Sequence, residues 1–341
     1  MVKGSKMSRP VVLITMGDPA GAGPEITLKA LSHPEVQEIA RFIIVGDLKV
    51  LMKAEGIVKT PLNLVPIDNL DELMGQSQQI GVMDLKNVEV DRLEYGKPSQ
   101  MGGKASYEYI VTAVNLIMKG KAHALVTAPI SKESLHLAGY NYPGHTELLA
   151  DLAGVKTVKM MLIAKHLRVS HVTTHVSLRK AITELIKTEN IYTTIKLTHE
   201  ALVRLFGIEK PKIAVAGLNP HASENGLFGD EEEKEIAPAI RLAEKDGIDA
   251  RGPYPPDSVF YRAYYHKEFD AVIAMYHDQG HIPVKMVGFM EGVNMTLGLP
   301  FIRTSPDHGT VWGKAGKGTA DETAMLEAIK LAAHLAKKLA G

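Results

Sequence analysis

The chain has 341 residues, and its 39 basic side chains are balanced by 39 acidic ones, so the formal net charge is zero. It has no cysteine, which excludes disulfides, thiolate catalysis and cysteine metal sites. No polybasic stripe indicates nucleic acid and no apolar run reaches the roughly 20 residues that span a bilayer, so we expect a cytoplasmic protein without either partner.

Strands and helices alternate along the chain. Met7 is a candidate for the natural start, with Met1 to Lys6 an extension. The predicted strands are apolar, mostly β-branched runs at 11–16, 42–47, 63–67, 124–129, 160–164, 169–174, 213–217 and 271–275. The predicted helices are 24–31, 48–55, 104–118, 177–187, 191–206, 230–245 and 321–339. The length suggests about two domains, and the alternation predicts an α/β fold with a mostly parallel sheet.

The glycine-rich turn after the first strand carries no dinucleotide fingerprint. Gly21 and Gly23 match its first two glycines, but Ile26 stands where the third glycine is required. No Walker lysine follows. We interpret the segment as a tight strand-to-helix turn, with Pro24 suited to the first helical position.

One stretch near the C-terminal third carries several reactive side chains. The buried strand predicted for 271–275 delivers His277 and Asp278 to its carboxyl end, and Gly280 is predicted to turn the chain. Lys285 follows a few residues later. Because ligands of open α/β sheets bind outside the carboxyl ends of the strands, we expect this stretch to contribute to the active site.

Histidines follow two other predicted strands in the same way. His175 lies past the strand that ends at Thr174, and His221 lies shortly after the strand 213–217. Together with His277 they predict a catalytic metal site with three imidazole ligands and an open position. The alternative is that they are ordinary surface or hydrogen-bonded histidines, since only the fold could bring such distant residues together.

Other side chains suit an anionic substrate. His145 and Thr146 open an apolar helix, whose N-terminus offers donors to an anion, although Thr146 could simply cap the helix. Lys285, Asn294 and Arg303 form a second group, which could equally be a set of exposed polar residues.

Two acids lie near the same places along the chain. Asp257 and Asp278 are each a candidate general base, a partner of a metal-binding histidine, or a helix cap.

Six segments of the chain resemble the 4-hydroxythreonine-4-phosphate dehydrogenase family. They occur in order between about Val11 and Asp321, at 16–21, 144–147, 173–175, 217–222, 275–280 and 294–305. The family is similar in fold to the isocitrate and isopropylmalate dehydrogenases, which implies two α/β/α domains with a central cleft. The resemblance implies a first, cofactor-side domain at 1–130 and 282–341 and a second domain at 131–281 that carries the metal ligands and the dimer interface.

The resemblance also implies the roles of the site residues. His175, His221 and His277 match the family's ligands to one divalent ion (Zn, Mg, Co or Mn), with His277 reaching in from the other subunit of a homodimer. The positions that match substrate contacts are His145, Thr146, Lys285, Asn294 and Arg303. Asp307, His308 and Gly309 are the expected contacts to NAD, and Lys285, Asp257 and Asp278 are the candidate catalytic residues.

The implied reaction is oxidation of the C3 hydroxyl of a 4-phosphorylated C4 acid, followed by decarboxylation to dihydroxyacetone phosphate. The family has one branch on the pyridoxal phosphate pathway and another in sugar-acid catabolism. His281 and Asn225 depart from the pattern of the first branch, which favours the substrates of the second, 4-phospho-D-threonate or 4-phospho-D-erythronate. The alternatives are the 4-hydroxythreonine-4-phosphate dehydrogenase of pyridoxal phosphate biosynthesis and, from another class, a phosphate acyltransferase-like enzyme.

Overall fold

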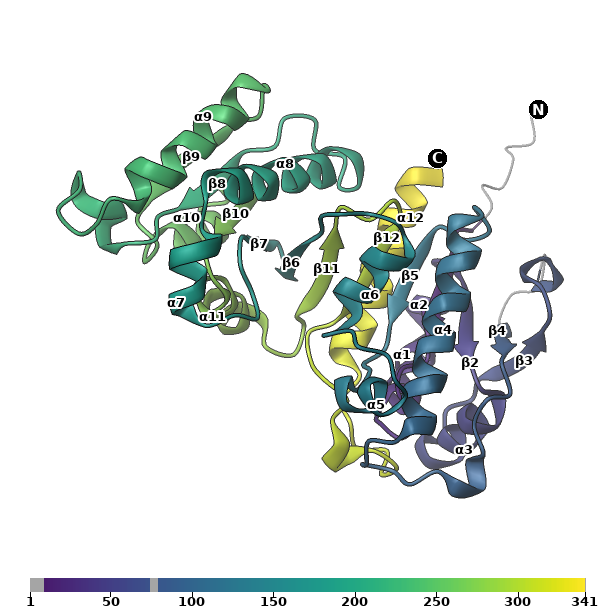
Figure 1. Ribbon diagram of the computed structural model, residues 1–341. Coiled ribbons are helices and arrows are strands. Elements are labelled where there is room, and N and C mark those ends of the chain that lie inside the picture. Colours follow the sequence, from purple (N-terminus) through teal and green to yellow (C-terminus); the bar gives the residue numbers. More distant parts are fainter. Residues whose placement is uncertain (1–8, 74–78, 341) are drawn as a thin grey trace, which may run out of the picture. The chain divides into compact units, whose positions relative to one another are not determined.

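The chain forms two compact units, each an α/β structure (Figure 1). The structure is a computed structural model that describes residues 9–73 and 79–340, so the predictions about Met1 to Lys6 and Met7 lie outside the described residues. Unit 1 comprises Met1–Thr157 and Leu299–Gly341, and unit 2 comprises Val158–Gly298. Over residues 9–73 and 79–340, we find no helix with the length and apolar character that crossing a membrane requires.

The limits of the units differ from the domain boundaries expected from the sequence, 130/131 and 281/282. The helices α5 (Lys132–Leu137) and α6 (His145–Leu152) pack on α4 (Gln100–Met118) and so belong to unit 1. The helix α11 (His277–Gly288) packs on strands of unit 2. The contacts that these helices make therefore decide the division of the chain.

The sheet of unit 1 is parallel throughout its described strands. Its order is β3-β4-β2-β1-β5-β12, with β1 (Val11–Thr15), β2 (Arg41–Gly46), β3 (Asn63–Ile67), β4 (Gln79–Asp84), β5 (Ala124–Thr127) and β12 (Ile302–Pro306). Parallel strands are covered by helices on both faces, which explains why all five residues of β1 are apolar or hydroxylic and buried.

Two layers of helices cover this sheet. On one face α4 packs on β1, β2 and β5, and α5 and α6 pack on α4. The helices of the other layer are α1 (Gly23–Leu31), α3 (Leu48–Val58) and α12 (Thr323–Ala340), with the short α2 (Pro34–Gln37) beside them. Asp47 fixes the start of α3, because its carboxylate accepts hydrogen bonds from the backbone N–H groups of Lys49 and Val50 at 3.0 and 3.2 Å.

The sheet of unit 2 is mixed. Its order is β11-β6-β7-β10-β8-β9, with β6 (Lys159–Ala164), β7 (Leu167–His171), β8 (Ile213–Ala216), β9 (Ala250–Tyr254), β10 (Ala271–Ala274) and β11 (Val293–Leu297). β7, β10, β8 and β9 are parallel, whereas β6 is antiparallel to both β7 and β11. The predicted α/β class is thus confirmed, and the antiparallel pairs lie at one side of this sheet only.

Alternate residues of the central strands build two separate cores. In β8, Ile213 and Val215 pack under the helices α8 (Thr188–Arg204) and α9 (Ala237–Lys245). Ala214 and Ala216 face the opposite core, under α10 (Val259–Tyr265) and α11. This two-residue period is what a strand buried on both faces requires. The short helix α7 (Leu178–Lys180) continues into a π-helical turn at Ala181–Leu185, and a second π-helical turn at Glu232–Ile236 precedes α9.

Gly280 lies inside α11 and not at a turn, so the turn predicted from the sequence is wrong. A Cβ atom at this position would lie 2.3 Å from His171 Nε2 and 2.9 Å from Val169 Cγ1. The glycine is therefore required by the close packing of α11 on β7, and not by a turn.

Replacing this glycine should be costly. We expect Gly280→Ala to lower the free energy of unfolding by about 1–3 kcal/mol through overpacking. Gly56 in α3 is the matched control, because a Cβ there would meet no atom of the described residues within 4 Å. Gly56→Ala should raise the free energy of unfolding by roughly 0.5–1 kcal/mol. Urea unfolding followed by circular dichroism measures both, and effects of the same sign would contradict the clash.

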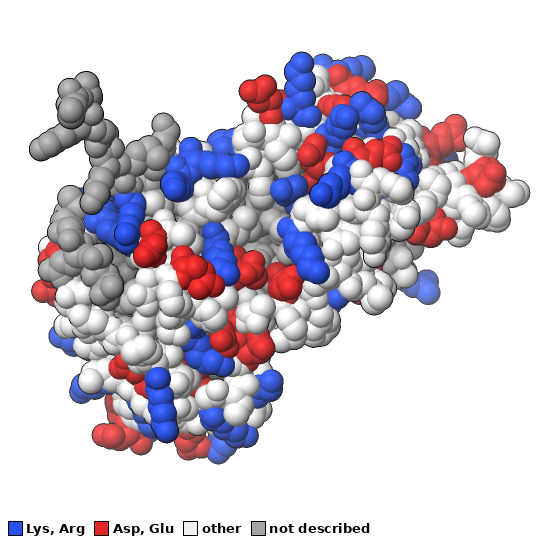
Figure 2. All heavy atoms as spheres, turned by 180° about the vertical axis from the view of Figure 1, so that it is seen from behind, with Lys and Arg blue, Asp and Glu red and all other residues white. Residues whose placement is uncertain are grey.

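Charge is distributed without segregation on the face seen in Figure 2. Basic and acidic side chains lie interspersed there, in agreement with the equal numbers of the two in the sequence.

Candidate active site

The three histidines expected to bind metal all belong to unit 2. His277 is the first residue of α11, and His175 lies in the loop that follows β7. His221 lies after β8, in the short 3-10 segment η4 (Pro220–Glu224). β7 already ends at His171, so the strand predicted to reach Thr174 is shorter than expected. A loop segment, and not the strand end itself, therefore carries His175.

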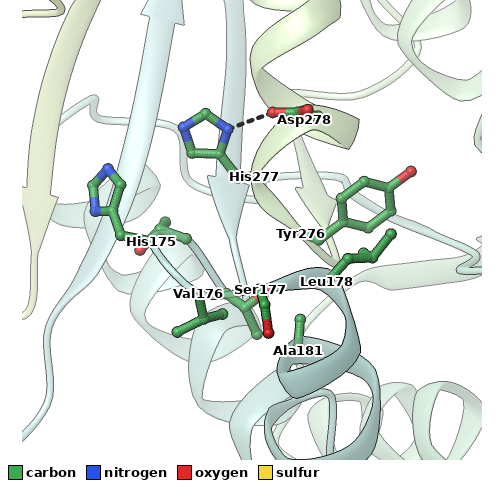
Figure 3. Close-up of a pocket in the computed structure, with 10 residues that line it drawn as sticks. His175, Val176, Ser177, Leu178, Ala181, Tyr276, His277 and Asp278 are labelled. Atoms are coloured by element: carbon green, nitrogen blue, oxygen red, sulfur yellow. Dashed lines mark hydrogen bonds and ion pairs between the residues drawn. The ribbon is translucent and has the colours of Figure 1, made fainter.

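His175 and His277 line one pocket, which has a volume of about 400 Å³. Their ring centroids are 5.7 Å apart, and the ring planes are inclined by 52°. Figure 3 shows the two rings on the same side of the pocket, with Tyr276 on the other side. The structure thus brings two of the three predicted ligands together within one chain.

The hydrogen bond of His277 fixes which of its ring nitrogens can bind a ligand. Its Nδ1 lies 2.6 Å from Oδ1 of Asp278, as the dashed line in Figure 3 marks. Because the carboxylate accepts, Nδ1 carries the hydrogen, and in the neutral ring the lone pair is therefore on Nε2. Metal-binding histidines commonly have this arrangement, in which a carboxylate holds the second ring nitrogen.

His221 lies on an unusual stretch of backbone. Its φ is 53°, and Ala222 to Asn225 also have positive φ values, between 47° and 69°. Glu232 holds the preceding residues, because its Oε1 accepts hydrogen bonds from the N–H groups of Leu218 and Asn219, both at 2.7 Å. Within residues 9–73 and 79–340, no group of three or more His, Asp or Glu side chains is placed to hold a metal ion.

Arg303 supplies a buried positive charge in unit 1. It lies within β12 and is 2% exposed, and its Nη2 donates to Thr127 Oγ1 on the neighbouring strand β5 at 2.7 Å. Burial lowers the pKa of Arg303 to about 9. The sequence had suggested an exposed cation as the alternative, and the burial of Arg303 contradicts that alternative.

His145 lies at the first helical position of α6, and the charge of Arg303 affects its pKa. Burial, followed by the positive charge of Arg303, lowers the pKa of His145 well below its usual range, so the ring is neutral. Its Nε2 is buried and makes no hydrogen bond with any described residue. Thr146 follows in the first turn, but Gly144, and not Thr146, is the N-cap residue of α6. A neutral imidazole and a guanidinium therefore lie together where an anion would be stabilised.

The other predicted substrate contacts are in unit 2. Lys285 lies on α11 with its Nζ 5.2 Å from the centroid of the Phe289 ring, and Asn294 lies on β11. Both are half-buried.

Asp257 and Asp278 line a second pocket of unit 2, with a volume of about 450 Å³. Both side chains are exposed. Asp278 contributes to the pocket of His175 and His277 as well, and so borders both hollows. Asp278 therefore lies next to His277 and interacts with it, whereas Asp257 lines only the second pocket.

The residues expected to contact a cofactor follow β12 in unit 1. Asp307 and His308 are half-buried and Gly309 is exposed. The Nδ1 of His308 lies 3.0 Å from the carbonyl oxygen of Gly309 and donates to it. Further along the same segment the chain is anchored to α1, since both oxygens of Glu25 accept backbone hydrogen bonds, from Gly316 at 2.5 Å and Gly318 at 2.6 Å.

Sequence reasoning missed the buried groups that support the histidines. Lys159 donates from Nζ to the carbonyl of Val172 at 3.0 Å and to Asn190 Oδ1 at 2.5 Å, next to the segment that leads to His175. Burial lowers the pKa of Lys159 to about 8. His171 was counted only as part of a strand. The four-residue spacing of His277 and His281 would have placed both on one face of a helix, had a helix been predicted there.

Several proteins to which the chain is similar are named dehydrogenases. The D-threonate 4-phosphate dehydrogenase of Cupriavidus necator is 48% identical over 332 residues, which cover 97% of this chain and 98% of that protein. The 4-hydroxythreonine-4-phosphate dehydrogenase of Trichlorobacter lovleyi is 44% identical over 330 residues, covering 96% and 98%. The crystal structure of 4-hydroxythreonine-4-phosphate dehydrogenase from Klebsiella pneumoniae matches with a TM-score of 0.90 at 43% identity, over 97% of this chain and 99% of that one.

The family profile described as pyridoxal phosphate biosynthetic protein PdxA matches residues 38–332. The chain belongs to this family and is an oxidoreductase that acts on a CH–OH group. The resemblance inferred from the six sequence segments is thereby confirmed, and so is the fold class that it implied.

Proposed function

We propose that the chain oxidises the C3 hydroxyl of 4-phospho-D-threonate or 4-phospho-D-erythronate with NAD. The hydroxyl loses its proton to a base and the C3 hydride passes to the nicotinamide, so the acid becomes a 3-oxo acid and NAD becomes NADH. This β-keto acid then loses its carboxylate as carbon dioxide, and protonation of C2 gives dihydroxyacetone phosphate.

The observation that carries the proposal is the buried charge of Arg303 beside neutral His145. The guanidinium of Arg303 is 2% exposed, and its pKa is lowered to about 9. An anionic ligand stabilises such a buried guanidinium more than it stabilises a guanidinium in water. A phosphorylated acid is such a ligand, and phosphorylated acids appear in the names of the relatives. Anchoring the substrate away from the reacting carbon orients the C3 hydroxyl.

We also propose that His175, His221 and His277 hold one divalent ion. The donor set fits, because the neutral ring of His277 keeps a lone pair on Nε2 while Asp278 holds Nδ1. When bound, such an ion supplies Lewis acidity to a hydroxyl oxygen and lowers its pKa. Asp257 and Asp278 are the proposed bases for the released proton, with Lys285 and Asn294 as further substrate contacts. Asp307, His308 and Gly309 are the proposed NAD contacts.

A homodimer is part of the proposal. The described residues carry large exposed apolar side chains, most of them in unit 2. On α11 and at its C-cap, Phe289, these form a stripe at helical spacing: Ile282 is 61% exposed, Met286 82% and Phe289 70%. Burial against a second copy would remove this stripe from water. It starts about one and a half turns after His277, so a subunit interface here would lie near this proposed metal ligand.

A charge on this stripe should therefore separate the subunits. We expect Met286→Glu with Phe289→Glu to give monomers with less than about a tenth of the wild-type activity, since a charge in an apolar interface core opposes association. Met52→Glu in α3, at 59% exposure in unit 1, is the matched control and should stay dimeric. Analytical ultracentrifugation gives the mass, and an unchanged dimer would contradict the proposed interface.

The function is tested by supplying both candidate acids. With NAD and Mn²⁺, 4-phospho-D-threonate should give NADH at 340 nm with a kcat/KM at least about tenfold above that for 4-phosphohydroxy-L-threonine, a difference of about 1.4 kcal/mol. The reverse preference would place the enzyme in pyridoxal phosphate biosynthesis. If neither acid reduces NAD, the proposed reaction is wrong, and acyl transfer to phosphate becomes the reaction to assay.

A further inference from the structure

A second layer of histidines lies beneath His277. The ring of His281 is stacked on the ring of His277, with centroids 3.6 Å apart and planes inclined by 12°. His281 is 6% exposed and His171, on β7, is 1% exposed. The two residues are in contact, since His281 Nδ1 lies 3.1 Å from His171 Nε2.

The directions of these hydrogen bonds follow from the partners. His281 Nδ1 also lies 2.9 Å from the carbonyl oxygen of His277, which can only accept. The hydrogen is therefore on Nδ1 of His281, and the Nε2 of His171 accepts from the same group. His171 has the protonation state that this requires, because burial, and after it the neighbouring histidines, lower its pKa to about 3 and keep the ring neutral.

The packing leaves His281 little freedom. His277 and His281 are four residues apart on α11, so their rings lie on the same face of the helix. On the other side His171 occupies the space that a side chain at position 280 would fill. His281 is thus held by a hydrogen bond, a helix and a buried ring, and its flat face rests on His277.

We propose that His281, held in place by His171, is a positioning residue that fixes the ring plane of His277 for binding a divalent metal ion. This inference rests on the proposed function, in which His277 is a metal ligand. Asp278 fixes the ring from its Nδ1 edge, and His281 fixes it from its face, so Nε2 is presented in one direction. A ligand whose orientation is set in advance binds metal more tightly than one that must be ordered on binding.

The ring of His281, and not its mere bulk, should be what matters. His281→Phe keeps a flat face against His277, whereas His281→Leu fills part of the volume without one. We expect His281→Leu to weaken Co²⁺ binding to the metal-free dimer by about 10–100-fold, as is usual for loss of a group that orients a metal ligand. His281→Phe should bind Co²⁺ as the wild type does. His166→Leu is the matched control, since it removes an exposed histidine that is stacked on Tyr264 elsewhere in unit 2.

The readout is the visible absorption of bound Co²⁺, which reports ligand geometry as well as affinity. The inference predicts a changed Co²⁺ spectrum in His281→Leu and an unchanged one in His281→Phe and His166→Leu. It is overturned if His281→Leu binds Co²⁺ as tightly as the wild type, or if His281→Phe loses as much affinity as His281→Leu. Should His281→Leu not fold, as judged by circular dichroism, His281→Met takes its place with the same expected loss. A wild-type protein that binds no Co²⁺ would instead reject the proposed metal site itself, and this inference with it.

Discussion

A heterodimer made of one His175→Ala subunit and one His277→Ala subunit is expected to have about half of the wild-type activity, although neither variant is active alone. Each single substitution removes a proposed metal ligand, which should cost several kcal/mol and lower kcat/KM on the order of 10³-fold. If His277 serves the site of the other subunit, one of the two sites in the heterodimer loses both ligands and the other keeps all of its own.

The measurement requires two affinity tags, so that the heterodimer is purified away from both inactive homodimers. His266→Ala, which removes an exposed histidine next to α10, is the control and should retain full activity alone. An inactive heterodimer would mean that His175 and His277 act within one chain, where their rings are 5.7 Å apart. Two fully active single variants would reject the ligand assignment altogether.

Arg303→Met should separate activity from stability. Removing a buried guanidinium that we propose to contact an anionic substrate is expected to cost about 2–5 kcal/mol of binding, so kcat/KM for the phosphorylated acid should fall by about 10²-fold or more. Met fills most of the volume of Arg303 but makes no hydrogen bond to Thr127 Oγ1, and the loss of such a bond typically costs about 1 kcal/mol. The midpoint of urea unfolding should therefore fall only slightly, whereas the activity should fall by orders of magnitude.

Two further variants complete this experiment. Arg303→Lys keeps the charge but not the planar fork and should recover only part of the lost activity. Arg262→Met removes a partly exposed arginine whose Nη2 lies 2.6 Å from Glu268 and should leave kcat/KM unchanged. A substrate KM that is unaffected by Arg303→Met would show that the anion binds elsewhere.

The sequence was sufficient to predict the elements that have a strong pattern. The apolar runs at 11–16 and 271–275 are buried strands because parallel strands covered on both faces need apolar residues on both. The helix predicted for 104–118 is present as Gln100–Met118, with Ser99 as its N-cap. The family could be inferred because its motifs are specific.

The sequence was insufficient to predict the role of a residue when that role depends on contacts with residues distant in the chain. Gly280 suggested a turn because glycine is common in turns, whereas its reason is the ring of His171 on another strand. The helix α11 was not predicted because Gly280 and Pro283, two residues that are unfavourable within helices, interrupt its pattern of apolar residues. The role of Lys159 depends on two residues, Val172 and Asn190, that only the fold brings to it. The burial of Arg303 likewise depends on β5 and the helices around it.

Unit 2 is continuous in sequence, whereas unit 1 is closed by the last part of the chain. During synthesis, Val158–Gly298 emerges as a complete α/β unit before β12 and α12 have been made. β5 must wait for β12, its partner in the sheet, and α12 then covers β12, β5 and β1. The part of the protein that carries the three histidines can thus fold first. The part that carries Arg303 becomes complete only when the C-terminal helix arrives.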